Sequence, residues 1–279
     1  MITRRNFCRL AAGAAALAAQ PALASAGRPL NKRGCCLAAG EDSPWLERMR
    51  MLRPDWMYSW GYRRPEGFPD NAEFVPMLWG DAGPKRQKRR IDELKARAEA
   101  GEVKNLLGFN EPDGFEQANM TVERVVELWP DLMEVDVPLI SPGCVHPDRV
   151  WMNEFMEQVE KRNLRVDAIA VHSYMGPSVE ILVRQLESVA RRFDRPLWIT
   201  ELAVGDWEAK SRSENRHSPE RVSAFLRELL PALDALPFVH RYAWFSANHD
   251  SAPLGTSALF DVAGRLTPLG TLYSRHKAS

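Results

Sequence analysis

Two glutamates in this sequence stand where buried strands are expected to end. The stretch 103–113 reads V-K-N-L-L-G-F-N-E-P-D, an apolar run that meets a polar tetrad containing Glu111. The stretch 196–204, P-L-W-I-T-E-L-A-V, carries Glu201 in the same way. Continuous apolar runs are typical of buried parallel strands, and in a barrel of such strands the chemistry collects at their carboxyl ends. Two glutamates so placed suggest an acid and a nucleophile.

Other polar and aromatic residues fall at the ends of the remaining predicted strands. They are Asn110, Trp60, Trp79, His172, Tyr174 and Trp244. In a barrel they would converge on one rim, and such a mixture suits a sugar, because indoles stack on its apolar ring faces while its hydroxyl groups need fixed hydrogen-bond partners. We therefore predict that these residues bind substrate. Each tryptophan taken singly is as consistent with the core as with a sugar platform, and the histidine fits an orienting group better than a base.

Two further polar features near the glutamates are interpreted as structural. Asp113 follows a proline, where an aspartate more often caps a turn or the next segment. A long charged loop at 205–217 follows Glu201, and the basic and acidic residues from 208 to 221 are interpreted as solvated rather than as substrate contacts.

The elements that must position these residues alternate between strands and helices. Strands are predicted at 33–39, 55–60, 74–79, 103–113, 138–144, 166–174, 196–204 and 239–246, and helices at 43–52, 84–100, 121–133, 150–161, 178–192, 218–236 and from about 267. The stretch 61–70 is rich in Gly, Pro and Arg and predicts a loop, so the second βα unit is abbreviated. This alternation predicts an α/β protein whose parallel sheet closes into a TIM (β/α)8 barrel. An open doubly wound sheet is the rival, but no G-x-G-x-x-G or phosphate-binding loop supports it.

Length and composition allow one sizeable catalytic domain. The chain has 279 residues, of which 45% are hydrophobic, and α/β barrels commonly have about 250 residues. It contains 37 basic and 37 acidic residues, so it lacks the basic excess that nucleic-acid binding normally requires. We exclude nucleic acid as a partner and expect a polysaccharide or oligosaccharide instead.

Residues 1–26 have the pattern of an export signal. T-R-R-N-F at 3–7 is a twin-arginine pattern, an alanine-rich apolar stretch follows, and A-S-A at 24–26 fits a cleavage site. The uncharged run of about 15 residues is shorter than the ~20 that a membrane span needs. We expect cleavage near Ala26, a single catalytic domain at 27–279, and a periplasmic or secreted monomer with no membrane contact after cleavage.

The cysteines do not form a fully paired framework. Of the four, Cys8 lies in the signal, and Cys35, Cys36 and Cys144 remain, which is an odd number. The adjacent pair lies in the apolar segment R-G-C-C-L-A, so we expect small buried core residues and no obligatory disulfide.

The motifs quoted above resemble those of glycoside hydrolase family 128, the Asl-like glycosyl hydrolase catalytic domain. The resemblance covers roughly 32–273, and its segments stand in order: L-G-F-N-E-P-D, Q-A-N-M at 117–120, I-S-P at 140–142, A-V-H-S-Y at 170–174, W-I-T-E at 198–201 and Y-A-W-F at 242–245. It implies a TIM barrel that hydrolyses β-1,3-glucan with retention, with Glu111 as acid/base and Glu201 as nucleophile. No metal and no cofactor are expected. The cysteine pair and the charged loop are not assigned by this resemblance.

Two other classes of protein remain open from the sequence. A non-catalytic exported glucan-binding TIM barrel would keep the tryptophans and need neither glutamate, and it would bind glucan without releasing reducing ends. A metal-dependent barrel hydrolase would need two or three His or Asp ligands on the rim, whereas only His172 stands clearly at a strand end. Loss of activity with a chelator would favour that class.

Overall fold

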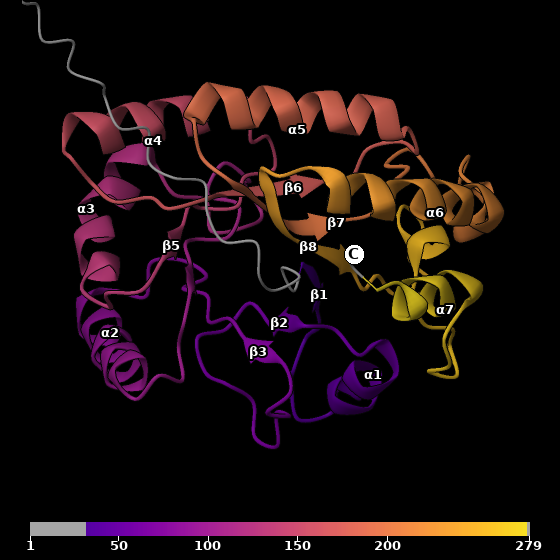
Figure 1. Ribbon diagram of the computed structural model, residues 1–279, viewed down its shortest axis with the longest axis horizontal. Coiled ribbons are helices and arrows are strands. Elements are labelled where there is room, and N and C mark those ends of the chain that lie inside the picture. Colours follow the sequence, from indigo (N-terminus) through magenta and orange to yellow (C-terminus); the bar gives the residue numbers. More distant parts are fainter. Residues whose placement is uncertain (1–31, 278–279) are drawn as a thin grey trace, which may run out of the picture.

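The chain folds with parallel strands in the middle and helices around them, as the computed structural model shows (Figure 1). The structure describes residues 32–277, so the predicted export signal at 1–26 lies outside the described residues. The strands are β1 (Arg33–Cys36), β2 (Trp56–Tyr58), β3 (Glu73–Phe74), β4 (Leu106–Leu107), β5 (Leu139–Ile140), β6 (Ile169–Ser173), β7 (Leu197–Leu202) and β8 (Val239–Phe245). The α-helices are α1 (Trp45–Leu52), α2 (Pro84–Glu99), α3 (Val122–Met133), α4 (Val150–Lys161), α5 (Val179–Phe193), α6 (Pro219–Ala235) and α7 (Pro268–Arg275).

The strands pair in parallel in two groups. Six form a sheet in the order β3-β2-β1-β8-β7-β6, and β4 pairs with β5. Isolated parallel bridges connect the two groups, one between Met77 and Leu107 and one between Ile140 and Ala168. A mixed α/β fold with a parallel sheet is therefore confirmed, and so is the absence of a helix between β2 and β3 in the described chain.

All eight strands are shorter than predicted, and three of them differ most. The structure has β3, β4 and β5 with two residues each, although the apolar runs that contain them are longer. Proline explains part of this difference, because Pro76 and Pro142 lie within the predicted strands and have no N–H group for a ladder.

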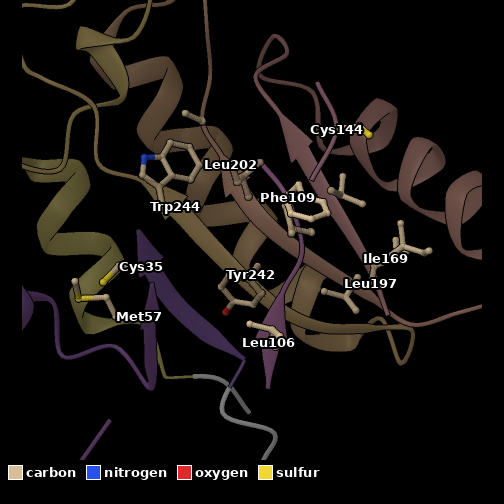
Figure 2. Packing of buried hydrophobic residues seen from close by; sticks show 14 of the residues in the cluster. Cys35, Met57, Leu106, Phe109, Cys144, Ile169, Leu197, Leu202, Tyr242 and Trp244 are labelled. Atoms are coloured by element: carbon tan, nitrogen blue, oxygen red, sulfur yellow. The ribbon is translucent and has the colours of Figure 1, made fainter. Parts of the chain in front are cut away.

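Side chains alternate across the strands and so build two apolar clusters. The smaller one draws on all eight strands or on residues beside them: Cys36, Trp56, Tyr58, Val75, Met77, Leu107, Ile140, Ala168, Ala170, Trp198 and Ala243. The larger one combines the other side of the strands with the buried faces of the helices, and Figure 2 shows part of it, including Cys35, Met57 and Trp244. Neighbouring residues such as Cys35 and Cys36 thus belong to different clusters.

The helix signals in the sequence are largely present in the structure. Thr121 caps α3, since its hydroxyl accepts from Arg124 N–H at 3.2 Å, and Gly101 follows α2 with a φ of +75°. In α5 the buried side includes Leu182, whereas Ile181 is 49% exposed because adjacent helical positions point about 100° apart.

The three described cysteines are free and buried, as the sequence predicts. Burial raises the pKa of the Cys35 thiol to about 12, although the nearby Arg33 opposes that shift. In the described part of the chain, no helix is both long enough and apolar enough to cross a membrane.

Candidate active site

Glu111 follows β4 and is held by the segment after β5. Its N–H donates to the carbonyl oxygen of Gly143 at 2.6 Å, and Asn110 forms an isolated parallel bridge with the same glycine. The φ of Glu111 is +42°, in the left-handed region that non-glycine residues rarely adopt. Such backbone persists only where its surroundings hold it, and it is concentrated at functional sites.

Glu201 lies within β7 at an irregularity of the ladder. Val171 of β6 pairs with Ile199, whereas the next residue, His172, pairs with Glu201, so Thr200 is an extra residue on β7. A bulge of this kind changes the direction in which the following side chain points and is common next to active sites. Here it places Glu201 directly opposite His172.

The two glutamates meet at His172. One carboxylate oxygen of Glu111, one of Glu201 and a ring nitrogen of His172 all lie within 4.8 Å of one another. His172 Nδ1 is 2.8 Å from Glu111 Oε1 and 3.6 Å from Glu201 Oε2. The exposed fractions of the side chains are 11% for Glu111, 6% for Glu201 and 0% for His172, so these three titratable residues are almost completely shielded from solvent.

Three neutral donors surround the carboxylate of Glu201. The hydroxyl of Tyr58 donates to Oε1 at 2.9 Å, and the indole N–H of Trp60 donates to the same oxygen at 2.8 Å. The hydroxyl of Tyr174 donates to Oε2. The φ of Trp60 is +57°, so a second residue of this site also has left-handed backbone. These bonds fix the orientation of the carboxylate without neutralising its charge.

The surroundings shift the pKa of three of these partners. Burial raises the pKa of Tyr58 and of Tyr174 well above the usual range, and the charge of Glu201 raises both further, so both phenols stay protonated donors. For His172, burial is the largest influence and lowers its pKa, but the attraction of Glu201 and Glu111 outweighs it, and the net pKa is raised.

Glu111, His172 and Glu201 are the described residues whose types and spacing could hold a metal ion. The atoms that face one another are already engaged, however, because both oxygens of Glu201 accept hydrogen bonds and His172 Nδ1 contacts Glu111 Oε1. A metal would have to displace these contacts. The arrangement fits the holding of protons better than the holding of a cation.

Asn110 and Trp79 lie close to this group along the chain. Asn110 is 3% exposed; its amide N–H donates to Gln117 Oε1 at 3.2 Å, and its own Oδ1 is buried without a partner. Trp79 is 40% exposed, and its carbonyl oxygen accepts from Asn110 N–H at 2.9 Å. One residue thus offers a free acceptor and the other an exposed indole.

The prediction that Trp244 binds substrate is corrected by its position. Its side chain is wholly buried in the larger apolar cluster, and its indole N–H donates to the carbonyl oxygen of Ser257 at 2.9 Å. Alternation along β8 explains this, because Ala243 belongs to the smaller cluster and Trp244 points the other way. The next residue, Phe245, faces the site instead, with its ring centroid 5.8 Å from that of Trp60 and 5.5 Å from that of Tyr174.

Two residues near the glutamates were missed by the sequence analysis. Tyr58 stands two residues before Trp60, and the period of a strand places both on one face, so this signal was available. Trp207 is 65% exposed and lies directly before the charged residues that were interpreted as solvated. Asp113 has the structural role expected of it, because its carboxylate accepts from Val145 N–H at 2.9 Å and from His146 N–H at 3.0 Å.

A cavity of about 390 Å³ lies at the other end of the strands. Asp55, Glu73 and Arg241, near the amino ends of their strands, contribute to its lining. Arg241 pairs with Glu73 at 2.7 Å and lies 4.2 Å from the ring centre of Trp198. The charge of Arg241 is thus neutralised by a structural ion pair. Neither Glu111 nor Glu201 lines this cavity, so it is distinct from the glutamate site.

The family model and the solved structures agree on one kind of enzyme. The family model described as glycosyl hydrolase catalytic core matches residues 40–273, and no curated protein matches the sequence. Among solved structures, the chain is similar to a family 128 (subgroup I) endo-β-1,3-glucanase from Amycolatopsis mediterranei in complex with laminaritriose, with 32% identity and a TM-score of 0.73 over 88% of this chain and 98% of that one. A subgroup II endo-β-1,3-glucanase from Sorangium cellulosum is similar with 26% identity and a TM-score of 0.69, over 88% and 98% of the two chains. A subgroup VI exo-β-1,3-glucanase from Aureobasidium namibiae, 21% identical, shares the fold with a TM-score of 0.69 over 89% and 97%.

Proposed function

Since the chain belongs to the glycosyl hydrolase catalytic core family and, within it, to glycoside hydrolase family 128, we propose that it is a retaining β-1,3-glucanase. The pair Glu111 and Glu201 carries this proposal. One oxygen of each lies within 4.8 Å of the other. Retaining glycosidases hold their two carboxyl groups about 5–5.5 Å apart, whereas inverting ones need about 6.5–9.5 Å to admit a water molecule.

We also propose that the eight strands close into a (β/α)8 barrel within one domain. The parallel bridges at Met77 with Leu107 and at Ile140 with Ala168 connect the two groups of strands on both sides. The smaller apolar cluster, which receives a side chain from every strand or its neighbour, is what the filled interior of a barrel requires. Both glutamates then lie on the carboxyl-end rim.

In the first step, the carboxylate of Glu201 attacks the anomeric carbon and forms a glycosyl ester. The bond to the departing oxygen breaks, and Glu111 gives that oxygen a proton. With Nδ1 of His172 as the donor to Glu111 Oε1, the proton that Glu111 transfers is carried on the other oxygen, Oε2. The negative charge of Glu201 is lost as the ester forms, and the three donors keep its side chain oriented during the attack.

In the second step, Glu111 acts as a base. Its carboxylate takes a proton from water, whose oxygen attacks the anomeric carbon and releases Glu201 as a carboxylate. The Nδ1–H of His172 stabilises the negative charge that Glu111 carries between the two steps, at 2.8 Å. Two inversions at one carbon give overall retention.

Substrate contacts follow from the same geometry. The unpartnered Oδ1 of Asn110 accepts from the sugar 2-hydroxyl, a bond that strengthens as positive charge develops in the ring. Trp60 and Tyr174 keep Glu201 in line, and the exposed indole of Trp79 stacks on a sugar ring.

A glutamine at position 201 tests the proposal. Glu201→Gln is expected to abolish reducing-end release from laminarin while the protein stays folded, because an amide is a poor nucleophile of nearly the same shape. Glu180→Gln, a 78% exposed carboxylate on α5, is the control and should keep full activity. Turnover retained in the first variant would remove Glu201 from the mechanism. NMR of the first product should show the β anomer, and an α product would mean inversion.

The site of action is proposed from the N-terminal sequence. We propose export by the twin-arginine route, cleavage near Ala26 and a monomeric enzyme in the periplasm or outside the cell. Sequencing of the N-terminus of exported protein and gel filtration of the mature form test these statements. A product that keeps residues 1–26, or a dimer, would contradict them.

A further inference from the structure

Trp207 presents a large apolar surface to solvent just after β7. Its side chain is 65% exposed, in a protein whose other large aromatic residues are mostly buried. An exposed indole adds little to folding, because the hydrophobic gain depends on apolar area removed from water. A ligand that covers the indole would recover that gain.

The indole lies one side chain away from Glu201. Its ring centroid is 5.8 Å from that of Tyr174, with the planes at 76°, and the hydroxyl of Tyr174 donates to Glu201. Gly205 makes this approach possible, because a Cβ on it would lie 3.3 Å from the indole nitrogen and 3.0 Å from the carbonyl oxygen of Tyr174. The indole is therefore an extension of the aromatic surface formed by Tyr174 and Phe245.

The loop that carries Trp207 is closed by an ion pair. Asp206, whose side chain is 3% exposed, accepts from the guanidinium of Arg216 at 2.6 Å and from Arg216 N–H at 2.9 Å. The hydrogen bond from Arg216 holds the pKa of Asp206 far below its usual range. Both ends of the loop also bind Pro253, whose carbonyl oxygen accepts from Asp206 N–H and from the side-chain amide of Asn215, both at 2.9 Å. These bonds fix the two ends of the loop 205–217, while charged side chains between them, such as Glu208, Lys210 and Glu214, are exposed to solvent as predicted.

We propose that Trp207 stacks on a glucosyl unit of the glucan chain being cleaved, and that the ion pair of Asp206 and Arg216 holds the Trp207 loop in position. This inference rests on the proposed function. The apolar face of a β-linked glucosyl ring presents C–H groups that match an indole. A rigid aromatic residue on a closed loop binds with a small loss of conformational entropy, because its orientation exists before the ligand arrives. Arg216 is a positioning residue, since it acts through Asp206.

Binding to an inactive protein tests the role of Trp207. In the Glu201→Gln background, calorimetry with laminarihexaose should show affinity lowered about tenfold or more by Trp207→Ala, as expected for losing one aromatic stack and the apolar area it covers. Val262→Ala, which removes a 73% exposed side chain elsewhere, should leave the affinity unchanged. Equal affinities in the Trp207→Ala protein and its parent would overturn the inference.

Kinetics in the active background test the ion pair. Arg216→Ala should raise KM for laminarin with little change in kcat, and Arg216→Lys, which keeps a charge for Asp206, should restore part of the loss. An unchanged KM in Arg216→Ala would refute the positioning role. If the wild type neither binds laminarihexaose nor cleaves laminarin, the proposed function fails; if it does both and Trp207→Ala binds equally well, this inference alone fails.

Discussion

Replacing Gly143 by alanine should displace His172 from Glu111. A Cβ on Gly143 would overlap His172 Nε2 and lie 3.1 Å from Cδ2 and Cε1 of the ring. The imidazole has no exposed surface, and its other nitrogen is 2.8 Å from Glu111 Oε1. The ring therefore cannot withdraw from the new methyl group without pushing on the carboxylate.

The size of the effect has two parts. Adding a methyl group to a well-packed interior typically costs about 1–3 kcal/mol of unfolding free energy. At about 2–4 °C for each kcal/mol, Tm should fall by about 2–12 °C. Losing the hydrogen bond to the charged Glu111, which is worth about 1.5–3 kcal/mol, should lower kcat by about 10- to 150-fold if the bond acts in the transition state.

Thermal unfolding and steady-state hydrolysis of laminarin measure both parts. Gly40→Ala is the matched control, because a Cβ on Gly40 would meet nothing within 4 Å, and it should change neither Tm nor kcat. A Gly143→Ala protein with the Tm and kcat of the wild type would refute the account of His172 as a fixed partner of Glu111. A lowered Tm with unchanged kcat would leave the packing argument standing and remove the catalytic one.

Two further substitutions test the group around Glu201. Tyr58→Phe removes a donor to Glu201 at 2.9 Å and should lower kcat on laminarin about tenfold or more. The control is Tyr242→Phe, which loses a hydrogen bond to Asp234 at 3.0 Å far from the site and should lower stability only. Equal kcat losses in both variants would contradict the role of Tyr58 in orienting Glu201. Because the folded-state pKa of His172 is raised, its contribution to stability is complete below the unfolded value of about 6.5 and is lost as pH rises through the folded pKa. Denaturant unfolding across this range should show that decline in the wild type and not in His172→Gln, and a decline of equal size in both would count against it.

Much of the fold was predictable because each strand is an apolar run bounded by turn signals. Buried parallel strands need no alternation in sequence, so runs such as the one in 196–204 mark them directly. Strand length was less predictable, since a ladder depends on partners that are distant in sequence. Pro76 and Pro142 were visible, but their effect on pairing depends on which neighbour each strand meets.

That the two glutamates lie close together could be predicted because parallel strands bring their carboxyl ends to the same edge of the sheet. The aromatic residues around them could not all be predicted, since one residue of register moves a side chain to the other face. In the run Y-A-W-F, Trp244 and Phe245 are equally good candidates for the site from the sequence alone. Only the pairing of β8 with β1 and β7 determines that the phenylalanine faces the site.

The backbone departs from regular geometry at both glutamates. This departure explains why the sequence could not predict the directions of their side chains. Glu111 has a positive φ, and Glu201 follows the extra residue of a bulge. Patterns that predict helices and strands describe regular backbone, so they locate these residues without giving their direction. Neighbouring contacts hold both irregular segments. The N–H of Glu111 donates to the carbonyl oxygen of Gly143 at 2.6 Å, and the side chain of Glu201 accepts from Tyr58 and from two further donors. The carboxyl groups are therefore held in place before substrate binds, which is the condition under which fixed dipoles lower a barrier without reorganising.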